Sequence, residues 1–225
     1  MYSCTEPTSI YMYNISSNLS KSMAKNGGVY SVHILKEGYS KAEEPGEQRA
    51  CGTISLVKGT HKIIVDTGNP WDRELIVRGL ASHGLCADDI DHVVCTHGHS
   101  DHVGNLNLFL NARHIVGYDV CQGDLYTDHP FSEGISLWID DVVEVKPTPG
   151  HTHSDVSLIV HNTKDGVTVI AGDLFECEED LKNPSIWKDN SEAPDMQESN
   201  RSQVLTVANV IVPGHGKLFH VTKTK

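Results

Sequence analysis

Short runs of β-branched and other apolar residues open the folded part of the chain. Residues 29–35, 53–57 and 62–65 each have the length and composition typical of a β-strand. A Lys-Gly-Thr turn at residues 58–60 separates the last two runs. These two runs therefore predict a hairpin.

Two later segments carry the period of an amphipathic helix. Residues 71–83 place Leu75, Ile76 and Leu80 on one face and have acidic residues in the first turn, where the helix dipole favours negative charge. Residues 196–207 predict a second helix of this kind. Further short strands are expected at residues 92–96, 113–116, 142–147, 156–160, 167–171 and 210–212.

The order of these elements indicates an α/β architecture. Strand, loop and helix units follow one another without a repeat or a linker, so residues 29–225 predict one domain with two sheets, helices outside them and a site along one edge. Residues 1–28 are rich in Ser, Thr and Asn and are expected to form a loosely ordered leader. Residues 176–194 are polar and broken by proline, which predicts an excursion or flap.

The charge balance limits the classes of function. The 225 residues include 30 acidic and 18 basic side chains, a formal net charge of −12. Such a surface repels nucleic-acid phosphates over most of its area, which excludes a general nucleic-acid coat protein. It does not exclude an enzyme that handles a phosphodiester in one cleft, because bound metal ions reverse the local potential.

Cysteine spacing and hydropathy bear on the cellular setting. The six cysteines form no C-x-x-C pair, so we expect buried packing residues, Cys95 and Cys177 included, rather than a zinc knuckle or a disulfide scaffold. The sequence shows no signal-peptide pattern and no run near the ~20 apolar residues that cross a bilayer. We therefore expect a location in the cytosol and nucleus, and no membrane partner.

The densest chemical signal is a loop directly after the strand predicted at residues 92–96. Four metal-competent side chains lie within six residues: His97, His99, Asp101 and His102. Imidazole and carboxylate groups bind zinc and related divalent ions. The H-x-H pair can converge on one ion, whereas the turn holds the following Asp-His pair at a different angle. Two adjacent ions are the economical arrangement.

Three further residues can complete such a site, and each follows an apolar run: His151, Asp173 and His215. Taken singly, a histidine at one of these places would more often be exposed or satisfied by a hydrogen bond. Four ligand-like residues in one loop, with three matching segments after it, favour a metal site over a purely structural role.

Asp66 ends a buried strand, where a carboxylate without partners would be costly. We expect it to orient a ligand imidazole or to accept hydrogen bonds from backbone amides of the His-rich loop. His153 could line the same cleft, although a bystander role is expected. The other histidines lack a ligand context and are expected at the surface or in packing: His33, His61, His83, His92, His114, His129, His161 and His220.

These motifs resemble those of a known family. Over residues 29–219 the chain is similar to the metallo-β-lactamase superfamily of binuclear metallohydrolases, whose motifs occur here in the same order: Asp66, the H-x-H-x-D-H element at residues 97–102, His151, Asp173 and His215. The resemblance implies an αββα sandwich with the metals at one edge of the two sheets. It also implies two divalent ions, one held by His97, His99 and His151, the other by Asp101, His102 and His215, with Asp173 bridging. Zinc is the expected ion, and iron or manganese are alternatives, because these ligands accept all three.

Within the family, His102 after Asp101 is closer to glyoxalase II and to RNA-processing nucleases than to antibiotic-hydrolysing members, so a true β-lactamase is disfavoured. Four strings are similar to those of an animal group classed with glyoxalase II: residues 66–71, 96–109, 171–176 and 212–216. This resemblance implies endoribonucleolytic cleavage at the 3′ end of histone pre-mRNA, by homodimers found in cytosol and nucleus.

The expected nucleophile is a hydroxide that bridges the two ions, which lower the pKa of the water they share. Asp101 and Asp173 are the predicted catalytic carboxylates, acting as ligands, and no residue is assigned as the leaving-group acid. The first hypothesis is an endoribonuclease acting on single-stranded RNA. The alternatives are a glyoxalase II-like thioesterase or small-ester hydrolase, and a metal-binding regulatory domain with little turnover.

The acidic balance and an aromatic content of only 6% weigh against an extended RNA-binding surface. Basic residues that could contact RNA are each more simply interpreted as ordinary surface: Arg113, Lys182, Lys188, Arg201 and Lys217.

Overall fold

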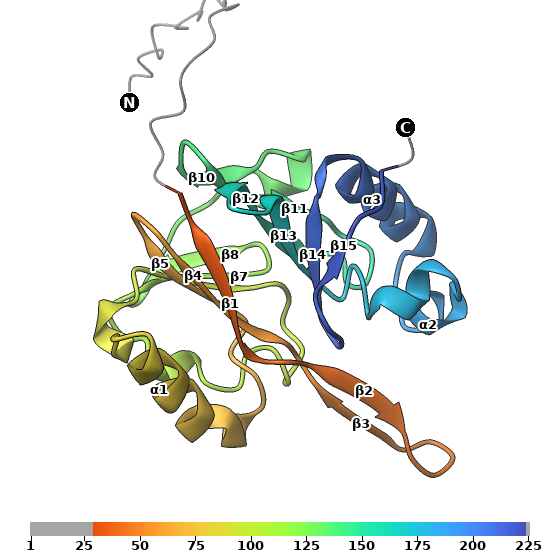
Figure 1. The fold of residues 1–225 in the computed structure, drawn as a ribbon, viewed down its shortest axis with the longest axis horizontal. Helices are drawn as coiled ribbons and strands as arrows, with labels where there is room; N and C mark the ends of the chain where they lie inside the picture. The colour runs from red at the N-terminus through yellow and green to blue at the C-terminus, as the bar shows by residue number, and fades with distance from the viewer. Residues whose placement is uncertain (1–28, 224–225) are drawn as a thin grey trace, which may run out of the picture.

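Two mixed β-sheets face each other in the computed structural model, which describes residues 29–223 (Figure 1). The first sheet is antiparallel at its margins and parallel across its centre, where β6 lies between β5 and β7. Its strands, in spatial order, are β1 (Ser31–Lys36), β4 (Ile54–Lys58), β5 (Lys62–Val65), β6 (His92–Cys95), β7 (Arg113–Val116), β8 (Asp119–Gln122) and β9 (Leu125–Tyr126).

The second sheet is built from the later part of the chain and has one parallel pair, β13 with β14. Its strands, in spatial order, are β10 (Leu137–Asp140), β11 (Val143–Pro147), β12 (Val156–Thr163), β13 (Gly166–Gly172), β14 (Val210–Pro213) and β15 (Phe219–His220). A separate antiparallel ribbon, β2 (Tyr39–Ala42) and β3 (Gln48–Cys51), extends away from the two sheets (Figure 1).

Three layers of apolar contact hold the sheets and helices together. Successive residues of a strand point to opposite faces, so in β4 Leu56 packs toward helix α1 (Arg73–Ser82) while Val57 lies between the sheets. Helix α3 (Pro194–Val207) covers the other side of the second sheet through Val204. Both faces of the central strands are therefore buried, which accounts for their near-continuous apolar sequences. The predicted αββα sandwich is confirmed.

The structure differs from the sequence-based expectation at several elements. The ribbon of β2 and β3 was not predicted, because most of its residues are polar and exposed. Helix α1 begins at Arg73 rather than at residue 71, since a 3-10 turn at Pro70–Asp72 precedes it and leaves Trp71 exposed. Other 3-10 turns occur at Ala87–Asp89, Leu106–Leu108, Phe131–Glu133 and Glu178–Leu181.

The polar segment at residues 176–194 is not a free flap. It contains helix α2 (Ser185–Lys188) and a 3-10 turn, and it packs onto the domain through Trp187, which is 3% exposed. The leader predicted for residues 1–28 lies outside the described residues. Within residues 29–223, no helix is both long enough and apolar enough to cross a membrane.

Candidate metal centre

The predicted donor residues meet at one edge of the sandwich, because the strands that precede them end there. The loop at residues 97–102 follows β6, and His151 follows β11. Asp173 comes directly after β13, and His215 lies two residues beyond β14. Residues far apart in the sequence thus line a single cavity of about 360 Å³.

Three imidazoles form the first group of donors. His99 Nδ1 lies 2.9 Å from His97 Nε2 and 3.0 Å from His151 Nε2. Asp173 Oδ2 is 3.7 Å from His97 Nε2 and 3.4 Å from His151 Nε2. Donor atoms that share one ion at about 2.0–2.2 Å lie roughly 3–4 Å apart, so this group is arranged for a single ion.

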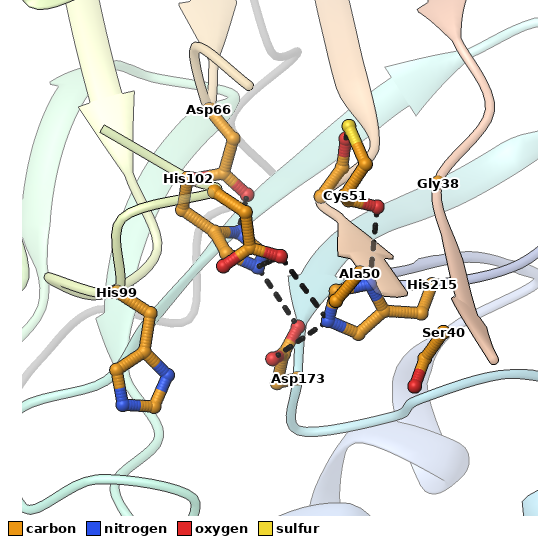
Figure 2. A network of polar contacts seen from close by, with 12 residues as sticks. Gly38, Ser40, Ala50, Cys51, Asp66, His99, His102, Asp173 and His215 are labelled. Carbon is orange, nitrogen blue, oxygen red and sulfur yellow. Dashed lines mark hydrogen bonds and ion pairs between the residues drawn. The ribbon is translucent and has the colours of Figure 1, made fainter. Parts of the chain in front are cut away.

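The second group combines imidazoles and carboxylates. Asp101 Oδ2 lies 3.9 Å from both His102 Nε2 and His215 Nε2. Asp173 Oδ1 is 3.3 Å from His102 Nε2, and Asp173 Oδ2 is 3.1 Å from His215 Nε2. Figure 2 shows Asp173 and His215 pointing toward one another, with His102 beside them. Asp173 therefore stands between the two groups.

Orphaned polar atoms show that these groups fit metal ions. Asp101 Oδ2, His102 Nε2 and Asp173 Oδ1 are buried and have no hydrogen-bond partner. A buried polar atom without a partner costs about 1–3 kcal/mol, and more when it is charged. All three face the second group of donors, so one cation there would satisfy all of them.

Hydrogen bonds at the outer ring nitrogens orient two of the imidazoles. His102 Nδ1 donates to Asp66 Oδ2 at 2.9 Å, and His215 Nδ1 donates to the Cys51 carbonyl oxygen at 3.1 Å. Each ring therefore keeps a hydrogen on Nδ1 and turns Nε2 toward the cavity, where Nε2 can bind an ion once it is deprotonated.

Asp66 ties the His-rich loop to strand β5. Its Oδ1 accepts a hydrogen bond from Thr96 N at 2.7 Å, while its other oxygen holds His102. Asp66 has a φ of 57°, and among residues 29–223 it is the one residue other than glycine whose φ is positive. Such a conformation costs about 1–2 kcal/mol, which these hydrogen bonds offset.

Close backbone approach also shapes the site. A Cβ atom at Gly214 would overlap Asp173 Oδ1, so only glycine leaves room for that carboxylate. Gly172 has a φ of 56°, and a Cβ there would meet the Thr96 hydroxyl. These two glycines let the second sheet come within contact of the His-rich loop.

Electrostatics divides the imidazoles into two kinds. Burial lowers the pKa of His97 and of His151, so both are neutral ligands. Burial opposes a charge on His102 and His215 too, but Asp173 and its neighbours outweigh it and raise the pKa of His102 to about 10 and that of His215 to about 9. A bound cation would displace these protons, because ligands bind in the deprotonated form.

Comparison with known proteins identifies the family. The sequence model of the metallo-beta-lactamase superfamily matches residues 51–120. Metallo-beta-lactamase domain-containing protein 1 of Xenopus laevis is 45% identical over 199 residues, which span 88% of this chain and 84% of that protein. The chain belongs to the metallo-β-lactamase superfamily.

Solved structures of the metallo-β-lactamase superfamily share the fold. A metallo-beta-lactamase-like protein from Thermotoga maritima superposes with a TM-score of 0.65 at 20% identity, covering 85% of this chain and 99% of that chain. An N-acyl homoserine lactone hydrolase with bound product superposes with a TM-score of 0.61 at 18% identity, covering 84% and 93%. Family and His/Asp cluster together identify the protein as a metal-dependent hydrolase of this superfamily.

Sequence reasoning missed three side chains that shape the centre. Glu176 lines the cavity and is 4% exposed, and burial followed by the charge of Asp173 raises the pKa of Glu176 to about 8. Asp155 accepts hydrogen bonds from Gly150 N and Thr152 N, which fixes the turn that carries the third histidine. Gln197 Nε2 donates to the Asp173 carbonyl oxygen at 2.9 Å.

A local signal existed for only one of these three. Asp155 lies four residues after His151 in a Thr-His-Ser-Asp turn, a common place for a carboxylate that caps backbone amides. Glu176 and Gln197 reach the site only through the tertiary fold. Glu176 lies at the start of the segment that leads into α3, and Gln197 lies in the first turn of α3 itself.

Several other predictions need correction. Arg201, expected at the surface, is 6% exposed and donates two hydrogen bonds to Asp180, which removes it as an RNA contact. Cys51 and Cys95 are buried as expected, but Cys86 is exposed, and Cys177 is only partly buried. Cys121 is also partly buried, and Cys4 lies outside the described residues.

His153 stays apart from the donor groups. Its side chain is 75% exposed, and its Nε2 lies 3.9 Å from Glu192. It belongs to none of the donor clusters in the described part of the chain, as expected of a bystander. Among the basic candidates, Lys182 and Lys217 are exposed, Arg113 is partly buried, and Lys188 pairs with Glu198 at 3.2 Å.

Proposed function

We propose that the chain is a binuclear metal-dependent endoribonuclease that hydrolyses a phosphodiester of single-stranded RNA, of the type that processes the 3′ end of histone pre-mRNA. The observation that supports it is a complete set of seven donors, five of which line a cavity open to solvent: His99, Asp101, His151, Asp173 and His215. Gln48, His99 and Asn190 form the exposed part of the cavity wall. An open edge of this kind accepts a chain that continues on both sides of the cut.

Two divalent ions at these donors, zinc by preference, would supply Lewis acidity to a phosphoryl oxygen and lower the pKa of water. The chain's own residues hold and aim the donors: Asp66 orients His102, and the Cys51 carbonyl orients His215. In the reaction a water oxygen bonds to phosphorus, the bond to the 3′ oxygen breaks, and the water proton ends on that departing oxygen.

Charge in the cavity makes substrate binding depend on the ions. Asp101, Asp173 and Glu176 line it, and no lysine or arginine of residues 29–223 does. RNA binding therefore draws on few protein cations, so its affinity should fall only slightly as salt rises, unlike that of proteins with many phosphate contacts.

The test is cleavage of a fluorescent single-stranded RNA by protein whose metal content has been counted. We expect metal-dependent cleavage that is abolished in Asp173→Ala and retained in Asp165→Ala, a matched change at an exposed turn between β12 and β13. Equal cleavage by wild type and Asp173→Ala would point to a contaminating nuclease and refute the proposal.

The second candidate is a hydrolase of a neutral thioester or small ester. It is favoured by the same cavity, since no basic side chain in the described part of the chain is present there to bind a phosphate. The fold is shared with an N-acyl homoserine lactone hydrolase, and a lactone is a cyclic ester. Thioester and lactone substrates belong in the same assay, and their turnover with intact RNA would favour this candidate.

Absence of any turnover with two ions bound would instead support a metal-binding regulatory domain. The homodimer and the cytosolic and nuclear location remain predictions. Sedimentation of the metal-loaded protein and fractionation of cells check them.

A further inference from the structure

Glu176 is a carboxylate buried beside the second group of donors. It is 4% exposed and lines the same cavity as His215 and Asp173. Its Oε1 accepts one long hydrogen bond, 3.4 Å, from the exposed Asn190 amide, and its Oε2 lies 4.0 Å from His215 Nε2. It is not one of the seven ligands that the sequence predicts.

Hydrogen bonds on both sides anchor the backbone of Glu176 at this place. Glu176 N donates to Asp180 Oδ2 at 2.8 Å, and Asp180 is itself held by Arg201. On the other side, His215 N donates to the Glu176 carbonyl oxygen at 2.8 Å. The chain therefore keeps the backbone of Glu176 next to that of His215, and the side chain is buried there.

No lysine or arginine in the described part of the chain compensates the charge of Glu176. Its ion-pair partner is the imidazole of His215, and a bound ion would displace the proton of that imidazole. Within residues 29–223 no lysine or arginine forms an ion pair with it, and Arg201 is committed to Asp180. Its nearest charged neighbours include the carboxylate of Asp173, which repels it. A buried carboxylate in this position costs several kcal/mol unless a cation is supplied.

The distances suit a shared ion. Two donors bound at about 2.1 Å to one ion are at most roughly 4.2 Å apart. Glu176 Oε2 lies 4.0 Å from His215 Nε2, and Asp173 Oδ2 lies 3.1 Å from the same nitrogen. The buried, unpartnered Oδ2 of Asp101 faces that nitrogen as well.

We propose that Glu176 is an additional ligand of the second ion and that it makes the two metal positions chemically different. Three imidazoles and one carboxylate form the first position, which suits tetrahedral zinc. Glu176 gives the second position three carboxylates and two imidazoles, an oxygen-rich set that favours a six-coordinate ion such as Mn²⁺ or Fe²⁺. This inference rests on the metal centre of the proposed function and does not depend on the substrate.

The test measures metal binding directly. The full chain is stripped with a chelator, loaded with one equivalent of Zn²⁺ and then dialysed against Mn²⁺, because Zn²⁺ in excess would displace Mn²⁺. Its metals are counted by mass spectrometry, and bound Mn²⁺ is followed by electron paramagnetic resonance. The variants are Glu176→Gln and the matched control Glu178→Gln, which lies two residues away and is exposed.

Wild type and Glu178→Gln should bind one Zn²⁺ and one Mn²⁺ per chain. In Glu176→Gln the affinity for Mn²⁺ should fall about 10- to 100-fold with a changed resonance signal, while Zn²⁺ at the first position is unaffected. The metal-free variant should be at least as stable as wild type, because the cost of burying a carboxyl group is removed, whereas a purely structural role predicts a less stable variant.

Mn²⁺ binding by Glu176→Gln equal to that of wild type overturns the proposal. If that variant does not fold, Glu176→Asp, which withdraws the carboxylate by one methylene, must weaken Mn²⁺ binding for the proposal to stand. A wild-type chain that binds no ion at either position would instead refute the metal centre itself, so the two failures are distinguishable.

Discussion

The substitution Arg201→Met removes the cation that anchors the segment following Asp173. The guanidinium donates to Asp180 Oδ1 at 2.5 Å and Oδ2 at 3.0 Å, and to the Leu174 carbonyl oxygen at 2.7 Å. It also lies between two aromatic rings, 4.2 Å from the centroid of Phe175 and 4.7 Å from that of Trp187.

The expected cost follows from the burial of both partners. Asp180 is 1% exposed, so the variant leaves a carboxylate in the interior without its cation. Removing one partner of a buried ion pair costs about 3–5 kcal/mol. Methionine retains much of the packing against the two rings, so we expect about 4 kcal/mol. With a urea m value of about 2 kcal/mol/M, the unfolding midpoint should fall by about 2 M.

Urea unfolding followed by circular dichroism measures this shift, with Lys188→Met as the matched control. Lys188 pairs with Glu198 at 3.2 Å, but both side chains are exposed, so its loss should cost less than about 1 kcal/mol. Combining Arg201→Met with Asp180→Leu should recover part of the loss. A midpoint for Arg201→Met no lower than that of the control would refute the reasoning.

Three further changes test the centre and its surroundings. Asp66→Asn keeps the shape but removes the charge that holds His102, so metal affinity should fall about 10- to 100-fold in a chelator-competition titration; unchanged affinity would contradict this role. Gly214→Ala places a Cβ against Asp173, so fewer than two ions per chain should be counted by mass spectrometry, and a full count would show that the loop adapts. Burial, then the neighbouring His61, lowers the pKa of His92 to about 4. His92 therefore takes up a proton at a higher pH in the unfolded chain than in the folded protein. The free energy of unfolding should fall as pH decreases from about 6.5 to 4. The difference in unfolding free energy between wild type and His92→Gln should change over that pH range, and a difference that stays constant would contradict this prediction.

The sandwich could be predicted from sequence because its strands are buried on both faces. Runs such as residues 63–65 and 210–212 are apolar throughout and too short for a helix, so each predicts a strand covered on both sides. The ribbon of β2 and β3 has no such signal, since its pairing comes from backbone hydrogen bonds between polar, exposed residues. Hydrophobic periodicity reports burial, and this ribbon is not buried.

The donors were recognisable because each follows a strand and four of them share one loop. Glu176 and Asp180 were not, because an acidic stretch in sequence resembles a solvated surface. Their burial depends on Arg201, 21 residues beyond Asp180 in the chain, and on the aromatic rings around it. Such a pairing exists only after α3 has packed, so no local pattern reveals it.

Each sheet is made from one continuous half of the chain, and the metal centre lies across the division. The first sheet ends with β9 at Tyr126, and the second begins with β10 at Leu137. The first half carries the donors of residues 97–102, while His151, Asp173 and His215 come from the second. Neither half contains all the donors of either ion, so bound ions act as cross-links between two chain segments, much as disulfides do. A backbone cut at residues 127–136 should therefore leave two fragments whose reassembly strengthens with the concentration of metal.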